Sequence, residues 1–421
     1  MHIALVGPIA TAQVRHLLAA DESALDALHE GYLGAPFLAT LIEALLARGH
    51  TVSAITTSVG MPLRRDATRW WHGERFHLAC CPMRPRAWPF NGWRPGRIVD
   101  LYAFERAGLL RAIRASGAEL VHAHWAGEFA LAALRSGLPH LITCHDLPAQ
   151  VARLQRGQRQ AAYRWLRAGM AWRVMGQARR LTTVSPHMVA QIGPQGRVPV
   201  ALVPNPLPAW VFKQPAQPEP GRQRVLMVNQ GFGPLKNLPP AWRAFAETRV
   251  THPDAELVML GQDFEPGGLA EAWCKAKLQG AEAMAGLRFI GPVSHREAIA
   301  WMARSDVLLH PSLQESFGMV VAEALAVGLP VVAGRASGAV PWVLGEHGRL
   351  VDVTQAQALA DALGGLLDNP ALRRQLGQAG RADMARRFNA AEVARLYERE
   401  YVSALRDAAP GRPAPPMDPH R

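Results

Sequence analysis

Two carboxylates, Glu315 and Glu323, stand eight residues apart in the stretch 306–334. The apolar run 307–309 is typical of a buried parallel strand, and the pattern predicts a helix over 318–327. The two acids would then flank the start of that helix. In an open α/β sheet this position faces the carboxyl ends of the strands, where ligands bind.

The start of the predicted helix would also bind an anion. The first N–H groups of a helix have no partner inside it, and the helix dipole favours negative charge there. Carboxylates beside an anion site suit a ligand that carries both a diphosphate and neutral hydroxyls, as a nucleotide sugar does. The backbone N–H groups that we expect to take part belong to Ser316, Phe317, Gly318 and Met319.

The elements that would position these groups form two α/β halves. Strand, loop and helix patterns alternate along each half, which predicts two Rossmann-like domains facing a cleft. A proline-rich, aperiodic stretch separates them. We expect a first domain at 1–205, a linker at 206–222, a second domain at 223–388, a helix at 389–406 that crosses back to the first domain, and a disordered tail at 407–421.

Three further residues are candidates by their position. His145 lies just past the predicted strand 140–143, although a lone histidine is more often structural. Lys236 lies in a Gly/Pro loop after a predicted strand. Gly34 precedes a helix, where glycine could let the backbone approach a ligand or could serve a plain turn.

Two basic regions contain tryptophans among arginines. Residues 61–98 read as irregular, and residues 150–180 as a long arginine-rich stretch. Tryptophan beside arginine suits a lipid–water interface or stacking on a sugar, and an amphipathic helix could lie on a membrane. The alternative at 61–98 is a surface segment whose tryptophans pack onto the domain. The alternative at 150–180 is a helix with its basic face in solvent and its apolar face on the core.

Composition limits the classes of protein. The chain has 421 residues and a net charge of +12, and 42 of its 46 basic residues are arginine. This charge suits a genome rich in arginine codons or an anionic partner; no nucleic-acid-binding signature is found. We expect reduced thiols and no metal, because no metal-ligand spacing appears. Without a signal sequence or a long apolar run, a cytoplasmic location is expected, at or near the inner membrane face.

The motifs resemble the retaining GT-B glycosyltransferases of family 4, the glycosyl transferases group 1. The segment HPSLQESFGMVVAEALAVGLPVVA resembles that family's E-x7-E element, with LRFIGPVSHREAIAWMARSD before it and GRLVDV after it. In the first half GHTVSAITT, VHAHW, LITCHD, TTVSPHMV and LVPNPLP match the family's landmarks in order. The resemblance covers about residues 1–405.

The resemblance implies a role for each matching residue. His145, Lys236 and Glu315 would be catalytic: His145 and Glu315 at the donor sugar, and Lys236 at the diphosphate. Glu323 would accept from the ribose hydroxyls. The further donor-binding residues would be Gly34, Gln230, Ser316, Phe317, Gly318 and Met319.

Three departures from the family pattern stand out. The arginine that often lies five residues before the lysine is Gly231 here, so Gln230 or Asn229 would have to supply a neutral donor. The acid of the family's Gly-Gly-x-Pro-Glu turn is replaced by Trp342. An insertion at about 9–30 displaces the first glycine loop.

The resulting hypothesis is transfer of a sugar from a nucleotide diphosphate sugar to a hydroxyl, with retention and without a metal cofactor. The acceptor would be a glycan or a lipid-linked molecule in bacterial polysaccharide or lipopolysaccharide assembly, reached through contact with an anionic membrane. Two alternatives remain: a nucleotide-sugar 2-epimerase of the same fold, and a non-catalytic glycan- or membrane-binding relative.

Overall fold

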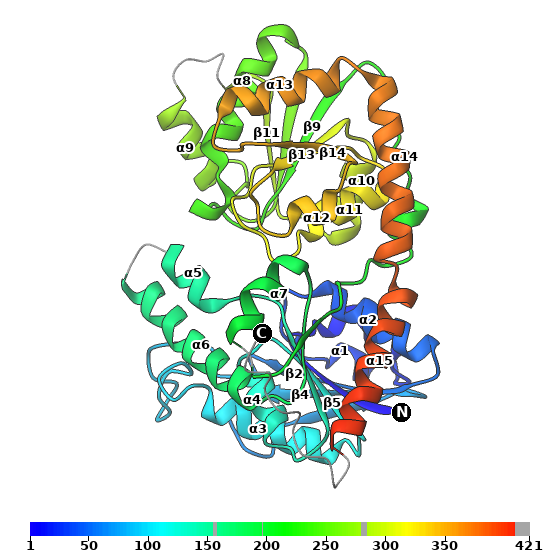
Figure 1. The fold of residues 1–421 in the computed structure, drawn as a ribbon. Helices are drawn as coiled ribbons and strands as arrows, with labels where there is room; N and C mark the ends of the chain where they lie inside the picture. Colours follow the sequence, from blue (N-terminus) through cyan, green and yellow to red (C-terminus); the bar gives the residue numbers. More distant parts are fainter. Residues whose placement is uncertain (155–157, 196, 279–283, 409–421) are drawn as a thin grey trace. The chain divides into compact units, whose positions relative to one another are not determined.

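The computed structural model describes residues 1–154, 158–195, 197–278 and 284–408 (Figure 1). These residues form two compact units. Among them, the first unit contains residues from 1–184, 188–206 and 390–408, and the second contains residues from 185–187 and 207–389. Each unit is an α/β domain built on a mainly parallel sheet.

The first unit holds an eight-stranded sheet in the order β3-β4-β2-β1-β5-β6-β7-β8. All neighbouring pairs are parallel except β3 and β4. A parallel sheet needs helical crossovers and is covered on both faces, which explains why its central strands are buried except at the first residues of β1 and β2. The strands are β1 (His2–Val6), β2 (Thr51–Ser58), β3 (Arg69–His72), β4 (Phe76–Pro82), β5 (Leu120–His124), β6 (His140–Cys144), β7 (Leu181–Thr183) and β8 (Val200–Leu202).

Helices cover both faces of this sheet. On one face α3 (Ala103–Ala115), α4 (Glu128–Leu134) and α6 (Gln158–Gln177) share a core with alternate strand residues. On the other, α2 (Pro36–Ala47) packs against α15 (Ala390–Ala408), which also contacts β5 and β6. The last helix of the chain is thus part of the first unit. The shorter helices are α1 (Glu22–Asp26), α5 (Pro148–Leu154) and α7 (Pro186–Ile192).

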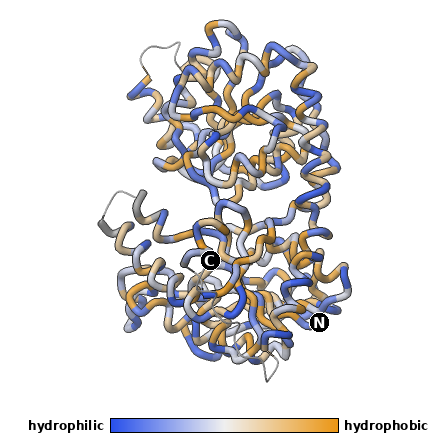
Figure 2. Tube along the Cα trace, viewed as in Figure 1, coloured by the Kyte–Doolittle hydropathy of each residue, from blue (hydrophilic) through white to orange (hydrophobic). Residues whose placement is uncertain are grey.

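The second unit holds a six-stranded parallel sheet in the order β11-β10-β9-β12-β13-β14. Its strands are β9 (Gln223–Val228), β10 (Ala255–Leu260), β11 (Leu287–Gly291), β12 (Val307–His310), β13 (Val331–Gly334) and β14 (Gly348–Val351). One core is shared with α8 (Leu238–Thr251), α9 (Leu269–Lys277) and α13 (Ala356–Leu367). The remaining helices are α10 (His295–Ala303), α11 (Met319–Val327), α12 (Val340–Leu344) and α14 (Pro370–Arg387). Figure 2 shows hydrophobic colouring along the strands of this sheet.

Two expectations are corrected. The region 61–98 is not irregular throughout, because it contains β3 and β4. The predicted linker 206–222 belongs mostly to the second unit, where Ala216 N donates to Val327 O (2.8 Å) and Gln217 N donates to Ala303 O (2.6 Å).

The predicted disordered tail begins too early by two residues, because α15 continues to Ala408. The rest of that predicted tail, 409–421, lies outside the described residues.

Candidate functional site

A lysine–glutamate pair lies at the carboxyl edge of the second sheet. Lys236 Nζ is 2.8 Å from Glu315 Oε1, and His310 Nε2, at the end of β12, is 3.5 Å from the same oxygen. Burial raises the pKa of Glu315, but the His310 interaction and the Lys236 charge outweigh it, so the pKa lies well below its usual value. The carboxylate is therefore ionised and accepts hydrogen bonds only.

Three hydrogen bonds to backbone carbonyls fix the loop that carries Lys236. Leu313 N donates to Leu235 O (2.8 Å). Asn237, which adopts a left-handed conformation, donates through Nδ2 to Pro311 O (3.2 Å) and Val353 O (2.8 Å). These bonds join the loop after β9 to the loop after β12 and to the chain after β14, so the lysine and the glutamate meet on preorganised backbone.

The start of α11 offers free backbone donors. Gly318 precedes the helix with a φ of +96°, a conformation that strains other residues. Within the described part of the chain, no group accepts a hydrogen bond from the backbone N–H of Ser316, Phe317 or Gly318. The Phe317 ring packs 5.2 Å from the ring of Phe388. These N–H groups are held in place and available to an anion.

The second predicted carboxylate, Glu323, is buried on α11 and pairs with His295 of α10. His295 Nε2 lies 2.8 Å from Glu323 Oε1. Burial lowers the pKa of His295, but the hydrogen bond with Glu323 outweighs it and the pKa is raised. Our sequence reasoning missed both His295 and His310. Their positions, in the first turn of a helix and at the carboxyl end of a strand, were the only signals available.

The loop after β9 contains Gly231, at the position where the family pattern often has an arginine. Gly231 has a φ of +81°, so a side chain there would be strained. The Asp263 carboxylate accepts a hydrogen bond from Phe232 N (2.9 Å) and lies 3.4 Å from where a Cβ on Gly231 would be. Gln230, the proposed neutral substitute, is exposed beside this turn. The turn therefore carries a carboxylate instead of a second positive charge.

Two predicted site residues, Gly34 and His145, belong to the first unit. Gly34 has a φ of +124° just before α2, with open space where a Cβ would lie. His145 follows β6 and is buried, with its ring 4.3 Å from the Trp125 ring and 5.0 Å from the Phe37 ring. The structure brings Lys236, Glu315 and the start of α11 together in the second unit.

A chain of buried polar groups leads from α15 to His145. Tyr401 OH bonds His122 Nδ1 (2.9 Å), and the His122 ring lies 4.1 Å from the ring of His124. His124 Nδ1 then bonds His145 Nε2 (2.9 Å). Burial lowers the pKa of His122 and His124 well below the usual value and that of His145 to about 3. At neutral pH all three rings are neutral, so His124 and His145 share one proton along their hydrogen bond.

These histidines make the stability of the first unit depend on pH. Their folded pKa values lie below the unfolded value of about 6.5, so the unfolded state binds protons first as pH falls. Their contribution is complete above pH 6.5 and is lost below it, by up to about 1.4 kcal/mol per pH unit for each ring. We expect urea unfolding free energies to fall steeply from pH 6.5 to 5.5 and to change little from 8.0 to 7.5. An equal slope in both windows would contradict this assignment.

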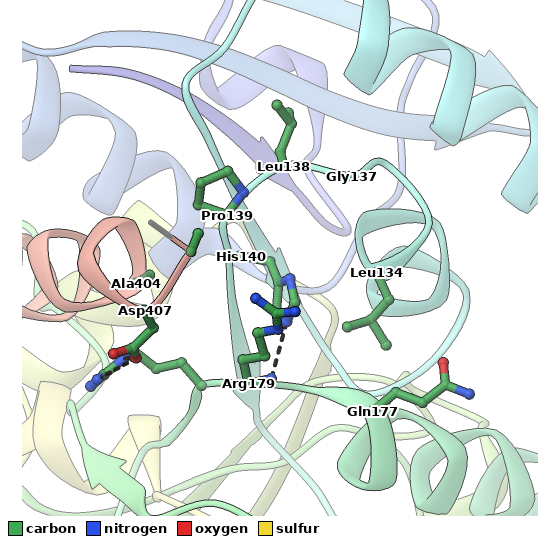
Figure 3. A pocket seen from close by; sticks show the side chains of 11 residues that line it. Leu134, Gly137, Leu138, Pro139, His140, Gln177, Arg179, Ala404 and Asp407 are labelled. Carbon is green, nitrogen blue, oxygen red and sulfur yellow. Dashed lines mark hydrogen bonds and ion pairs between the residues drawn. The ribbon is translucent and has the colours of Figure 1, made fainter. Parts of the chain in front are cut away.

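The pocket in Figure 3 lies elsewhere. It has a volume of about 380 Å³ and lies at the amino end of β6, whereas His145 follows the carboxyl end of the same strand. His140 Nε2 accepts from Arg179 N there (3.1 Å), and Arg180 pairs with Asp407 (2.8 Å). Ligands of open α/β sheets bind at the carboxyl edge, so this pocket is not the candidate site.

In the part of the chain that the structure describes, no group of three or more His, Cys, Asp and Glu side chains is arranged to hold a metal ion. No described helix is long and apolar enough to cross a membrane.

Comparison with known proteins gives matches to both halves. The family Glycosyl transferases group 1 matches residues 211–383, and Glycosyltransferase Family 4 matches residues 35–209. The MMP alpha-(1->4)-mannosyltransferase of Mycolicibacterium hassiacum is 31% identical over 313 residues, 70% of this chain and 74% of that protein. The glycogen synthase of Mycobacterium tuberculosis is 28% identical over 401 residues, 90% of this chain and 93% of that protein.

Solved structures share the fold. Sucrose-phosphate synthase from Thermosynechococcus elongatus superposes with a TM-score of 0.71 at 23% identity, covering 97% of this chain and all of that one. Anabaena HepE, solved with UDP and glucose, gives 0.65 at 15% identity, with 96% of this chain and all of that one covered. These neighbours fit the two parallel-sheet domains of the GT-B fold.

Proposed function

The chain belongs to the glycosyl transferases group 1, and from this premise we propose that it transfers a sugar, with retention, from a nucleotide diphosphate sugar to a hydroxyl acceptor. The observation that carries the proposal is the Lys236–Glu315 pair beside the free N–H groups of α11. A cation and backbone donors suit a diphosphate, and an ionised carboxylate suits sugar hydroxyls. That HepE was solved with UDP and glucose supports a nucleotide-sugar donor.

In the proposed mechanism the protein compensates for charge that develops on the leaving group. As the bond between the anomeric carbon and the phosphate oxygen breaks, the diphosphate gains negative charge, which Lys236 and the α11 N–H groups stabilise. The acceptor oxygen attacks from the same face and passes its proton to the departing phosphate oxygen. Glu315 and the neutral His145 bind the sugar, and Glu323, with one oxygen held by His295, accepts from the ribose.

We propose that this reaction needs no metal ion, because Lys236 and the helix dipole supply positive charge where a metal would act. Turnover should then persist in excess EDTA. Loss of turnover in EDTA, with recovery on adding Mg²⁺ or Mn²⁺, would refute this part of the proposal.

The function is tested by incubating the protein with each nucleotide sugar, first alone and then with acceptors. A transferase releases the nucleoside diphosphate, slowly by hydrolysis without an acceptor and faster with one. A 2-epimerase instead interconverts the donor sugars when given donor alone. A non-catalytic relative leaves every donor unchanged. Nucleoside diphosphate release that no acceptor accelerates would argue against transfer.

We propose that the acceptor is lipid-linked, in polysaccharide or lipopolysaccharide assembly at the inner membrane face. Residues 147–218 contain ten basic residues and no aspartate or glutamate. Along α6, within this stretch, Trp165 (42%), Leu166 (37%) and Trp172 (48%) are exposed. Interfacial helices combine exposed tryptophan with a basic surface in this way. A basic face that contacts only solvent is the alternative.

Membrane contact has a direct test. The protein should sediment with vesicles containing phosphatidylglycerol at low salt and dissociate at about 0.5 M salt, since exposed charges are then screened. Trp165→Ala combined with Trp172→Ala should weaken binding by roughly tenfold. Val250→Ala with Leu269→Ala, at exposed apolar sites of the second unit, is the matched control. No sedimentation at low salt would refute the contact.

A further inference from the structure

The first unit contains a second pocket, lined by arginine and aromatic side chains. It has a volume of about 310 Å³ and lies along α3, beside the loops that precede β3 and follow β4. We name it the α3 pocket. It is lined by Arg65, Arg84, Trp93, Arg94, Pro95, Asp100, Ala103, Phe104, Ala107 and Arg111.

One of its arginines is already neutralised. Arg84 is fully buried and bonds both carboxylate oxygens of Asp100 (2.8 Å each) and Glu105 Oε2 (2.6 Å). Asp100, the only acid in the lining, is therefore taken up by Arg84. The remaining positive charges in the lining have no acidic partner there.

Those charges belong to Arg65, Arg94 and Arg111. Within the described residues, the side-chain hydrogen bonds of Arg94 and Arg111 go to neutral carbonyls: Arg94 Nη2 donates to Leu63 O (3.1 Å) and Arg111 Nη2 donates to Arg65 O (2.9 Å). Each guanidinium has five N–H donors, so most remain available. Three uncompensated guanidiniums around one cavity favour an anion with several acceptor oxygens.

The aromatic side chains fix one guanidinium and offer a surface for a sugar. Arg94 Cζ lies 4.1 Å from the centroid of the Trp93 ring and 4.3 Å from that of Phe104, so its plane is held between two rings. Trp93 is 80% exposed. The exposed indole ring gives a sugar an apolar surface on which to pack, beside the guanidinium of Arg94.

The pocket lies beside the carboxyl edge of the sheet but far from His145 along that edge. Arg84 follows the carboxyl end of β4, and α3 begins at Ala103 beside the same edge. Between β4 and β6 lie β2, β1 and β5. Four strand spacings of about 4.8 Å place the pocket roughly 19 Å from the end of β6. A ligand group bound here would be remote from the reacting hydroxyl.

We infer that the α3 pocket binds an anionic group, a phosphate or a carboxylate, on an extended acceptor whose hydroxyl reacts about four strand spacings away. That the bound anion belongs to an acceptor rests on the proposed function. That the pocket binds an anion rests on the pocket alone. The anion could belong to a sugar phosphate of the glycan or to the phosphate of its lipid carrier.

Titration calorimetry with defined probes tests the inference. Glucose 6-phosphate should bind to the wild-type protein more tightly than inorganic phosphate, and glucose should bind least. Arg94→Gln combined with Arg111→Gln should weaken glucose 6-phosphate binding at least tenfold. Arg114→Gln, at an exposed arginine on the same helix outside the pocket, should leave binding unchanged.

A lipid phosphate, dihexanoyl phosphatidic acid, is compared with glucose 6-phosphate in the same experiment. Whichever of the two phosphate esters binds more tightly identifies the source of the anion.

The test separates this inference from the proposed function, because UDP binding at the second unit should be equal in the wild type and the double variant. Equal glucose 6-phosphate binding by the double variant and the wild type would overturn the pocket assignment. Inorganic phosphate binding as tightly as both esters would overturn its link to an acceptor. If the wild-type protein does not bind UDP, the result counts against the proposed function alone.

Discussion

Replacing Lys236 by alanine is expected to lower kcat by about 100- to 1,000-fold, because removing one preorganised donor to a developing charge has effects of this size. Lys236 carries the positive charge of the Lys236–Glu315 pair (2.8 Å). The second positive charge that the family often places at the diphosphate, an arginine, is absent, because this chain has Gly231 at that position. The lysine therefore carries an unusually large share of the charge compensation.

The effect of the Lys236 change should be on turnover and not on folding. Both side chains of the pair are about one-fifth to one-quarter exposed, with 24% for Lys236 and 20% for Glu315. Part-exposed ion pairs contribute about 1 kcal/mol or less. Steady-state kinetics and urea unfolding measure the two effects separately. Lys213→Ala, at an exposed lysine of the same unit, is the matched control. A kcat within twofold of the wild type would remove Lys236 from the mechanism.

Arg84→Met is expected to destabilise the first unit by about 3–5 kcal/mol, the usual cost of leaving a buried charge without its partner. The Arg84 and Glu105 side chains are both 0% exposed and lie 2.6 Å apart. Methionine would fill part of the volume but would leave the Glu105 and Asp100 carboxylates without their guanidinium. Urea unfolding measures the change.

A second variant controls for the buried pair. Adding Glu105→Leu to Arg84→Met removes the uncompensated buried charge, so the double variant should recover part of the lost free energy. A loss below about 1 kcal/mol in the single variant, or no recovery in the double variant, would contradict the buried-charge argument.

Much of the second unit could be predicted from sequence because its signals are local. An apolar strand, a loop with Glu315, a helix start and Gly328 follow one another in a single βαβ unit. The helix begins at Met319 and ends at Val327, with Gly328 in the left-handed conformation. Each of these features depends on residues within a few positions of one another.

The first unit was harder to predict because its features depend on distant partners. β3 (RWWH) is a short edge strand that pairs antiparallel with β4, and its sequence alternates too little to predict that. The His122–Tyr401 bond joins residues 279 positions apart. In the second unit, the prediction of a linker failed for the same reason: the proline-rich chain around Ala216 is held by Val327, more than a hundred residues away.

The most direct test of the central claim is a thermal-shift titration with UDP-, GDP- and ADP-sugars. The account predicts that one of these donors raises the unfolding temperature in proportion to the logarithm of its concentration; at 100 times the dissociation constant this corresponds to about 2.7 kcal/mol. The shift should be strongly reduced in a Lys236→Ala, Glu323→Gln variant and kept in Lys213→Ala. No shift with any donor at millimolar concentration, or an equal shift in the wild type and the double variant, would contradict a donor site at Lys236 and the start of α11.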